Sequence, residues 1–294
     1  MIDVRRVPLR VAAAISALVI LIAAWPGPSR AQDQSAKDSA AFRDVMAFAE
    51  REHLRSLPLG SVMARVGRYF VGTPYVPHTL EQPGDECLVV NLREFDCTTF
   101  MENVLVLSRC IVAGKKAYAE YAAELQFVRY RGGAIDGYPS RLHYFTDWAF
   151  DNERKNVLKN ISVNLGGGVS RKKIDFMSTH AGSYRQLADT SFGRRIAEFE
   201  SEMNARGFSY VPRERVRKIL PRLKEGDIIG TVTDMAGMDV AHTGLIVREK
   251  GIPRFLHAPL SGKKVLISDG SLAEYIGGLR GVSGVVVLRP SPPR

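Results

Sequence analysis

The sequence lacks the signatures of two large hydrolase classes. It contains no His-Glu-x-x-His or similarly compact set of metal ligands, which argues against a zinc hydrolase. It also contains no Gly-x-Ser-x-Gly, which argues against a serine hydrolase of the α/β type. The run Gly166-Gly167-Gly168 is not followed by Lys-Ser or Lys-Thr, so it predicts a mobile turn and not a phosphate loop. We therefore expect neither a metal nor a cofactor.

Long apolar runs are absent from the sequence after the N-terminal segment. In the N-terminal segment, three arginines precede an apolar run from Val11 to Trp25, and Ser29-Arg30-Ala31 supplies the small residues of a cleavage site. This run is short for a bilayer span of roughly 20 residues. We predict a cleaved signal peptide over residues 1–31, with an uncleaved anchor as the alternative. The mature protein would then be exported to the bacterial periplasm, with no stable membrane anchor.

Basic residues outnumber acidic residues in this sequence. Removal of residues 1–31 takes four arginines and one aspartate, so the net charge falls from +10 to +7. Such an excess suits a polyanionic or carboxylate-rich partner. The densest basic run, residues 213–224, has no interleaved aromatic residues, and we interpret it as a solvated helix face. Because the chain is also expected to be exported, nucleic acid is not predicted as a partner.

The apolar pattern predicts helices before residue 130 and strands after residue 226. After a polar segment over 32–39, predicted to be disordered, we expect one catalytic domain over 40–294 with a groove-forming insertion over about 115–215. Periodic apolar residues predict helices over 40–70, broken at Pro58, and over 97–112 and 116–127. Short β-branched runs predict five antiparallel strands, at 227–232, 241–248, 253–258, 265–268 and 284–289. The fold class is therefore α+β, with a helix packed on an antiparallel sheet.

Cys97 is the candidate nucleophile. It stands at the start of an apolar helix, directly after Asp96, which can cap that helix. The helix dipole there is expected to lower the thiol pKa toward the thiolate. His242 and His257 lie far downstream in strand-like segments and can meet the thiol in space. These residues predict a cysteine hydrolase.

Cysteine itself is scarce, with three in 294 residues. Helical spacing places Cys110 on roughly the opposite face of the helix from Cys97, so we expect it to be a small buried hydrophobic residue. Cys87 precedes the helix in a loop. The sequence is compatible both with a Cys87–Cys110 disulfide and with free thiols at these positions.

Several segments of the sequence, in the same order along the chain, resemble those of the NlpC-type, papain-like cysteine hydrolases. More narrowly, the sequence is similar to their N-acetylmuramoyl-L-alanine amidase-like branch, on Leu92–Phe100 and Arg141–Trp148. It differs from the usual pattern in having Thr98-Thr99 where Ser-Gly commonly follows the Asp-Cys, and Pro259 where Ser is frequent. The shared NlpC-type segments are Gly72–Val76, Asp96-Cys97, Gly226–Ile228, His242–Ile246 and His257.

The resemblance implies a papain-like core and cleavage of the amide between N-acetylmuramic acid and L-Ala in peptidoglycan or muropeptides. Cys97 would attack, His242 would carry the proton, and His257 would orient His242. Tyr75 would lie beside the thiol and donate to the oxyanion or the substrate, although a packed core aromatic is the alternative. A D,L-endopeptidase that cuts the D-Glu–diamino acid bond, and a non-catalytic cell-wall binding module, are the alternative functions.

The segment Arg141–Trp148 allows two interpretations. Its polar residues Arg141, His143 and Asp147 alternate with apolar ones, as in a strand with one polar face. Because the segment matches the narrower branch, Arg141 and Asp147 are alternatively predicted to line the substrate groove. Arginine suits the carboxylates of stem peptides, since its planar fork can bind a carboxylate bidentately.

Overall fold

The computed structural model describes residues 30–293. The predicted signal peptide, residues 1–31, lies outside this part of the chain except for Arg30 and Ala31. Within residues 30–293, no helix combines the length and the apolar character that a bilayer crossing requires.

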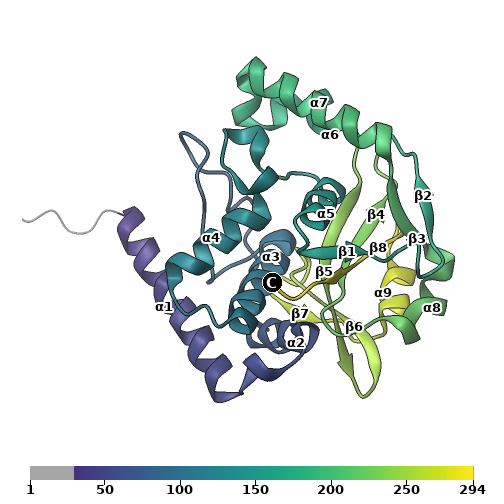
Figure 1. Cartoon of the computed structure of the whole chain (residues 1–294). Helices are drawn as coiled ribbons and strands as arrows, with labels where there is room; N and C mark the ends of the chain where they lie inside the picture. Colours follow the sequence, from purple (N-terminus) through teal and green to yellow (C-terminus); the bar gives the residue numbers. More distant parts are fainter. Residues whose placement is uncertain (1–29, 294) are drawn as a thin grey trace, which may run out of the picture.

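Nine α-helices and eight strands make up the regular structure of these residues (Figure 1). The helices are α1 (Arg30–Arg51), α2 (Leu59–Tyr69), α3 (Cys97–Ala113), α4 (Tyr118–Arg129), α5 (Phe145–Arg154), α6 (Phe176–Thr179), α7 (Thr190–Arg206), α8 (Val216–Ile219) and α9 (Leu272–Gly278). The strands are β1 (Leu158–Asn160), β2 (Gly168–Ser170), β3 (Phe208–Pro212), β4 (Ile228–Thr233), β5 (Val240–Glu249), β6 (Ile252–His257), β7 (Leu266–Ile267) and β8 (Val282–Pro290).

The strands form one antiparallel sheet in the order β2-β3-β8-β4-β5-β6-β7, and β1 also pairs with β8. The five strands expected from the sequence correspond to β4 through β8. The short strands β1 to β3 come from the predicted insertion and extend the sheet beyond β8. The α+β class and the antiparallel sheet are confirmed.

Both faces of the sheet are buried. Side chains alternate between the two faces of a strand, and on β5 Leu245 and Val247 join the large core while Ile246 joins a second, smaller one. The large core lies between the sheet and α1 to α5. The small core lies under α8 and α9, on the opposite face of the sheet (Figure 1). The β-branched runs of the sequence are nearly continuous because neither face needs a polar residue.

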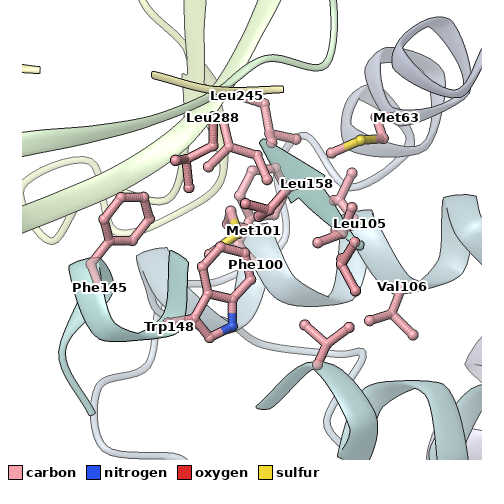
Figure 2. Close-up of a cluster of buried hydrophobic side chains, with 14 of the residues drawn as sticks. Met63, Phe100, Met101, Leu105, Val106, Phe145, Trp148, Leu158, Leu245 and Leu288 are labelled. Carbon is pink, nitrogen blue, oxygen red and sulfur yellow. The ribbon is translucent and has the colours of Figure 1, made fainter. Parts of the chain in front are cut away.

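Helix α3 runs through the centre of the large core. Every residue from Thr99 to Ile111 is buried. Figure 2 shows Phe100, Met101 and Leu105 of this helix among side chains of the sheet, α2 and α5. Its buried Glu102 is paired with Arg129 of α4, and each side chain is 2% exposed (2.8 Å between Oε2 and Nε). This ion pair ties the helix that carries Cys97 to its neighbour.

The structure differs from the expected disorder over residues 32–39, which belong to α1. The reason is a tertiary contact that local composition does not reveal. Asp38 is 2% exposed, and it accepts hydrogen bonds from the Leu92 N–H (3.0 Å) and from Arg93 Nε (3.1 Å). These bonds anchor the polar start of the helix against the segment that leads to Cys97.

Residues 131–195 contain more regular structure than their glycine-bearing sequence indicates. Helix α5 covers Phe145–Arg154, so the strand interpretation of the alternating segment Arg141–Trp148 is wrong. The alternation fails because Arg141 and Asp147 are themselves buried and paired, so they do not mark a solvent face. Helix α7 was also not anticipated, and it lies along one edge of the molecule beside α6 (Figure 1).

We predict that Arg129→Met destabilises the protein by about 3–5 kcal/mol, because it leaves the Glu102 carboxylate buried without its partner. The free energy of urea-induced unfolding measures this. The double variant Glu102→Leu with Arg129→Met should recover much of the loss. Lys116→Ala, which breaks the exposed Lys116–Glu50 pair, serves as the control and should change stability little. Equal losses in Arg129→Met and Lys116→Ala would contradict the prediction.

Candidate active site

The N-terminus of α3 is fixed by a capping box. The Thr99 N–H donates to Asp96 Oδ1 (2.7 Å), and the Asp96 N–H donates to Thr99 Oγ1 (2.9 Å). The threonine that departs from the common Ser-Gly pattern is therefore the reciprocal half of the cap. Cys97 is the first residue of the helix, where backbone N–H groups have no acceptor within the helix. Its N–H is available to an oxyanion.

A hydrogen bond from β5 holds the same helix end in place. The buried Thr243 hydroxyl donates to the Cys97 carbonyl oxygen (2.9 Å). Thr243 directly follows His242, so one short segment of β5 both supplies a histidine and fixes the position of the cysteine. Cys97 itself is partly exposed.

His242 and His257 form a pair across β5 and β6. His242 Nε2 lies 2.6 Å from His257 Nδ1. The His257 ring is 1% exposed and stacks on Phe255, with ring centroids 4.6 Å apart. Gly244 is the antiparallel partner of His257, and a Cβ at that position would lie 2.8 Å from His257 Cβ. Only glycine leaves this contact free of a clash.

The pair restricts the tautomers of the two rings. If His242 carries its proton on Nε2, that N–H donates to His257 Nδ1, and His242 Nδ1 can accept a proton. His257 then carries its own proton on Nε2. This atom is buried and has no hydrogen-bond partner among the described residues. The arrangement can therefore orient His242 as a base.

Burial sets the protonation states of the site. It lowers the pKa of His242 to about 4, and, together with the charge of His242, it lowers the pKa of His257 to about 3. Burial also raises the pKa of the Cys97 thiol, and the Asp96 carboxylate adds to this effect. Hydrogen bonds from Thr243 and Thr98 act in the opposite direction but are outweighed. The expected lowering of the cysteine pKa by the helix terminus is therefore not found, and the resting pair is a neutral thiol beside a neutral imidazole.

A cavity of about 170 Å³ brings Cys97 and His242 into one wall. Side chains from distant parts of the chain complete the cavity wall, among them Glu81, Tyr138, His143, Tyr144, Tyr184 and Asp239. The sequence analysis did not select these residues as site residues. The one available signal was the position of His143, two residues after Arg141 in a segment that had been selected.

Tyr75 lies at the base of the site, outside the residues that line the cavity. Its N–H donates to the Lys263 carbonyl oxygen (2.9 Å), and its backbone bridges to Phe95, just before the cysteine helix. Burial raises the pKa of its hydroxyl, and a negative charge on a Cys97 thiolate and the charge of Asp96 add to this effect. Tyr75 is thus in electrostatic range of Cys97.

Arg141 and Asp147 do not line the cavity. Arg141 is 5% exposed, and its guanidinium donates to Glu81 (2.6 Å) and to the Leu80 carbonyl oxygen (3.2 Å). Asp147 is 3% exposed and is paired with Arg131 and Arg206. The two charges satisfy internal partners, so the structure does not support their predicted place in the substrate groove.

The remaining cysteines are free thiols in the described structure. Cys87 is exposed, and Cys110 is buried, which raises the pKa of its thiol to about 12. Cys87 and Cys110 are therefore separate free thiols in this structure and do not form a disulfide. Within residues 30–293, no group of three or more His, Cys, Asp or Glu side chains is arranged to hold a metal ion.

A family model and several solved structures are similar to this chain. The model of a family described as AmiA-like, N-acetylmuramoyl-L-alanine amidase-like, matches residues 65–282. A crystal structure described as an N-acetylmuramoyl-L-alanine amidase from Bacteroides uniformis is 34% identical, with a TM-score of 0.75, and the match covers 79% of this chain and 99% of the other. A Bacteroides fragilis structure with a provisional xylanase name is also 34% identical, with a TM-score of 0.72, over 76% of this chain and 98% of the other. A Legionella pneumophila structure at 18% identity and a TM-score of 0.64, covering 88% of this chain and 96% of its own, shares the fold. The search of curated proteins finds no match.

We predict that alkylation of Cys97 by iodoacetamide accelerates steadily as the pH rises from 5 to 9, because burial raises the thiol pKa and the thiolate is the reactive form. The measurement uses the Cys87→Ser variant, so that the exposed thiol of Cys87 does not contribute. Fast alkylation that is already constant at pH 5 would instead indicate a resting thiolate–imidazolium pair.

Proposed function

The chain belongs to the AmiA-like, N-acetylmuramoyl-L-alanine amidase-like family, and on this premise we propose that it hydrolyses the amide between N-acetylmuramic acid and L-Ala with Cys97 as nucleophile. The observation that carries the proposal is the shared cavity wall of Cys97 and His242, together with the hydrogen bond between His242 and His257. A peptidoglycan-directed hydrolase is what the family implies. The cysteine mechanism, the NlpC-type papain-like core and export to the periplasm are parts of this proposal.

The chemistry starts from neutral groups. Cys97 Sγ attacks the lactyl carbonyl carbon while His242 accepts the thiol proton, and the developing oxyanion accepts a hydrogen bond from the Cys97 N–H. His242 then donates that proton to the leaving nitrogen of L-Ala, and a thioester remains on Cys97. Water attacks the thioester as His242 accepts its proton. The bond between the acyl carbon and Cys97 Sγ then breaks, and His242 returns its proton to the sulfur. The lactyl carboxyl group leaves and releases its remaining proton to solvent as it becomes a carboxylate.

Three surrounding residues support these steps. His257 orients His242 through the 2.6 Å contact and can share the positive charge that His242 acquires. Thr243 positions the Cys97 backbone, and therefore the oxyanion donor, through its bond to the Cys97 carbonyl oxygen. We assign to Tyr75, which is in electrostatic range of the thiol, the donation of its hydroxyl to the oxyanion or to the substrate.

We predict that the mature protein converts a disaccharide-peptide into free disaccharide and an intact peptide that begins with L-Ala, and that Cys97→Ala abolishes this reaction while the fold is retained. Mass spectrometry of the digest identifies the bond, and circular dichroism checks the fold. Products that retain L-Ala-D-Glu on the sugar would instead identify an endopeptidase with the same cysteine chemistry. Cleavage within the glycan would indicate a glycosidase.

We predict that His242→Ala lowers kcat/KM by about 10²–10⁴-fold, the usual contribution of a positioned base, and that His257→Ala lowers it less. In the wild type, kcat/KM should be retained above pH 5 and fall as the pH drops through about 4, because protonated His242 cannot accept the thiol proton. Steady-state kinetics across pH measure both effects. A larger loss at His257, or an acidic limb near the ordinary histidine pKa of about 6.5, would contradict these assignments.

A further inference from the structure

We propose that a basic surface over α8 docks this protein on an anionic phospholipid bilayer, as a peripheral and reversible contact. The proposal goes beyond the hydrolysis of peptidoglycan and does not depend on it. None of the residues that form this surface lines the cavity of Cys97. We call the surface the basic patch, and it comprises Arg213, Arg215, Arg217, Lys218, Arg222, Lys224 and Arg248.

The basic run over residues 213–224 is not a single helix with one solvated face. It folds as the short helix α8 with a 3₁₀ turn on either side, at Arg213–Arg215 and at Leu220–Arg222. Its apolar side chains are buried in the small core, and they are Val216, Ile219 and Leu223. The basic side chains between them are exposed, and they are Arg215, Arg217, Lys218, Arg222 and Lys224. The run therefore covers the small core and gives it a cationic outer surface.

Four arginines of the patch are held by main-chain carbonyl oxygens. A carbonyl oxygen orients a guanidinium without neutralising it, because it carries no net charge. A guanidinium also has five N–H donors, so one such bond leaves others available to a phosphate. The pairs are Arg213 with Gly277, Arg215 with Gly166, Arg222 with Asn164 and Arg248 with Gly251, each at 2.6 Å between nitrogen and oxygen.

Nearby carboxylates do not balance the charge of the patch. Three of them are paired with arginines outside it, Asp227 with Arg289, and Glu225 and Glu249 with Arg68. Glu214 and Glu274 are exposed beside the patch and have no arginine or lysine within ion-pair distance among the described residues. Seven cationic side chains therefore face two free carboxylates, and the surface attracts anions.

The cations of the patch surround two hollows. Arg222, Lys224 and Arg248 line one of about 740 Å³. Arg213 and Arg217 line another of about 370 Å³, between α8 and α9. These helices lie side by side at one edge of the molecule (Figure 1). Because arginine binds phosphate oxygens bidentately, each hollow suits the phosphate of one lipid headgroup.

Two exposed aliphatic side chains flank the patch. Val163 is 54% exposed and directly precedes the residue whose carbonyl oxygen holds Arg222. Ile252 is 44% exposed and directly follows the residue whose carbonyl oxygen holds Arg248. Apolar side chains beside cations are typical of a surface that enters the interface of an anionic bilayer. A soluble polyanion would use the cations alone, so the combination favours a bilayer.

The first test measures how the mature protein, without its apolar N-terminal run, partitions onto vesicles. Vesicles of phosphatidylglycerol mixed with phosphatidylcholine are compared with vesicles of phosphatidylcholine alone. We expect binding to the anionic vesicles only. This binding should be lost as the salt concentration rises from about 0.1 M to about 1 M, because the Debye length shortens from about 10 Å to about 3 Å. Equal binding to both kinds of vesicle, or binding to neither, would overturn the proposal.

The second test compares two triple variants that lose the same net charge. The patch variant changes side chains that make no hydrogen bond or ion pair with another described residue, so it should fold normally: Arg217→Gln, Lys218→Gln and Lys224→Gln. The control changes exposed arginines of α1 and α7: Arg43→Gln, Arg51→Gln and Arg194→Gln. A cation at an anionic bilayer contributes about 5-fold to binding, so the patch variant should lower the partition coefficient roughly 100-fold. The control should change it little, and equal losses in both variants would contradict the proposal.

A third test separates a bilayer from the cell-wall polymer. We expect the double variant Val163→Ser with Ile252→Ser to weaken vesicle binding roughly 10-fold, because less apolar surface enters the interface, and to keep its salt dependence. Purified peptidoglycan sacculi are assayed in parallel. Binding to sacculi that the patch variant loses, without binding to anionic vesicles, would overturn the proposal and assign the patch to the wall. All variants should keep the wild-type kcat/KM on a soluble muropeptide, since none of the changed residues lines the cavity of Cys97.

Discussion

The site depends on the way in which the first turn of α3, a helix that is buried from Thr99 to Ile111, is held against the sheet. The Asp96–Thr99 capping box fixes where α3 begins, and the Thr243 hydroxyl fixes that beginning to β5 at 2.9 Å. These contacts determine the position of the Cys97 sulfur relative to His242. They also determine where the Cys97 N–H points, because the donor at a helix start is oriented by the helix itself. A shift in either contact would move the nucleophile and the oxyanion donor together.

Burial of this helix end has an electrostatic consequence. Removing the thiol and both imidazoles from water disfavours their charged forms, and the nearby Asp96 carboxylate further disfavours a thiolate. The helix terminus acts in the opposite direction, but its effect on a surface charge is only about 0.3–1 kcal/mol. Desolvation therefore outweighs the dipole. In the proposed mechanism, proton transfer to His242 therefore accompanies the attack on the substrate and does not precede it.

The insertion before β3 builds the cavity. Residues around Tyr138 and Tyr144 come from this segment, and they meet Cys97 of α3 and His242 of β5 in one wall. Ion pairs hold the insertion in shape. Within it, the buried Asp147 joins Arg131 and Arg206, and Arg141 joins Glu81 of the segment before α3. The core of the fold supplies Cys97 and His242, whereas the insertion supplies much of the cavity wall around them.

The sequence alone determined the features that depend on neighbours along the chain. Asp96, Cys97 and an apolar run are enough to predict a capped helix, and the β-branched runs after Gly226 are enough to predict β4 to β8. The histidines could be selected because the motifs that contain them resemble those of a known family. The sequence pattern predicts these helices and strands because helix capping and strand alternation depend on residues that are close along the chain.

The tertiary structure decided every property that depends on partners distant in sequence. Asp38 anchors a helix in a segment that is polar by composition, because its acceptor atoms meet Leu92 and Arg93. Arg141 resembled a substrate ligand in the sequence, but in space its guanidinium donates to Glu81 and to the Leu80 carbonyl oxygen. The pKa of Cys97 rises because of burial, and burial is set by the packing of the whole core. The cavity residue Tyr138 gave no signal in the sequence, since its place in the wall depends on elements that are distant along the chain.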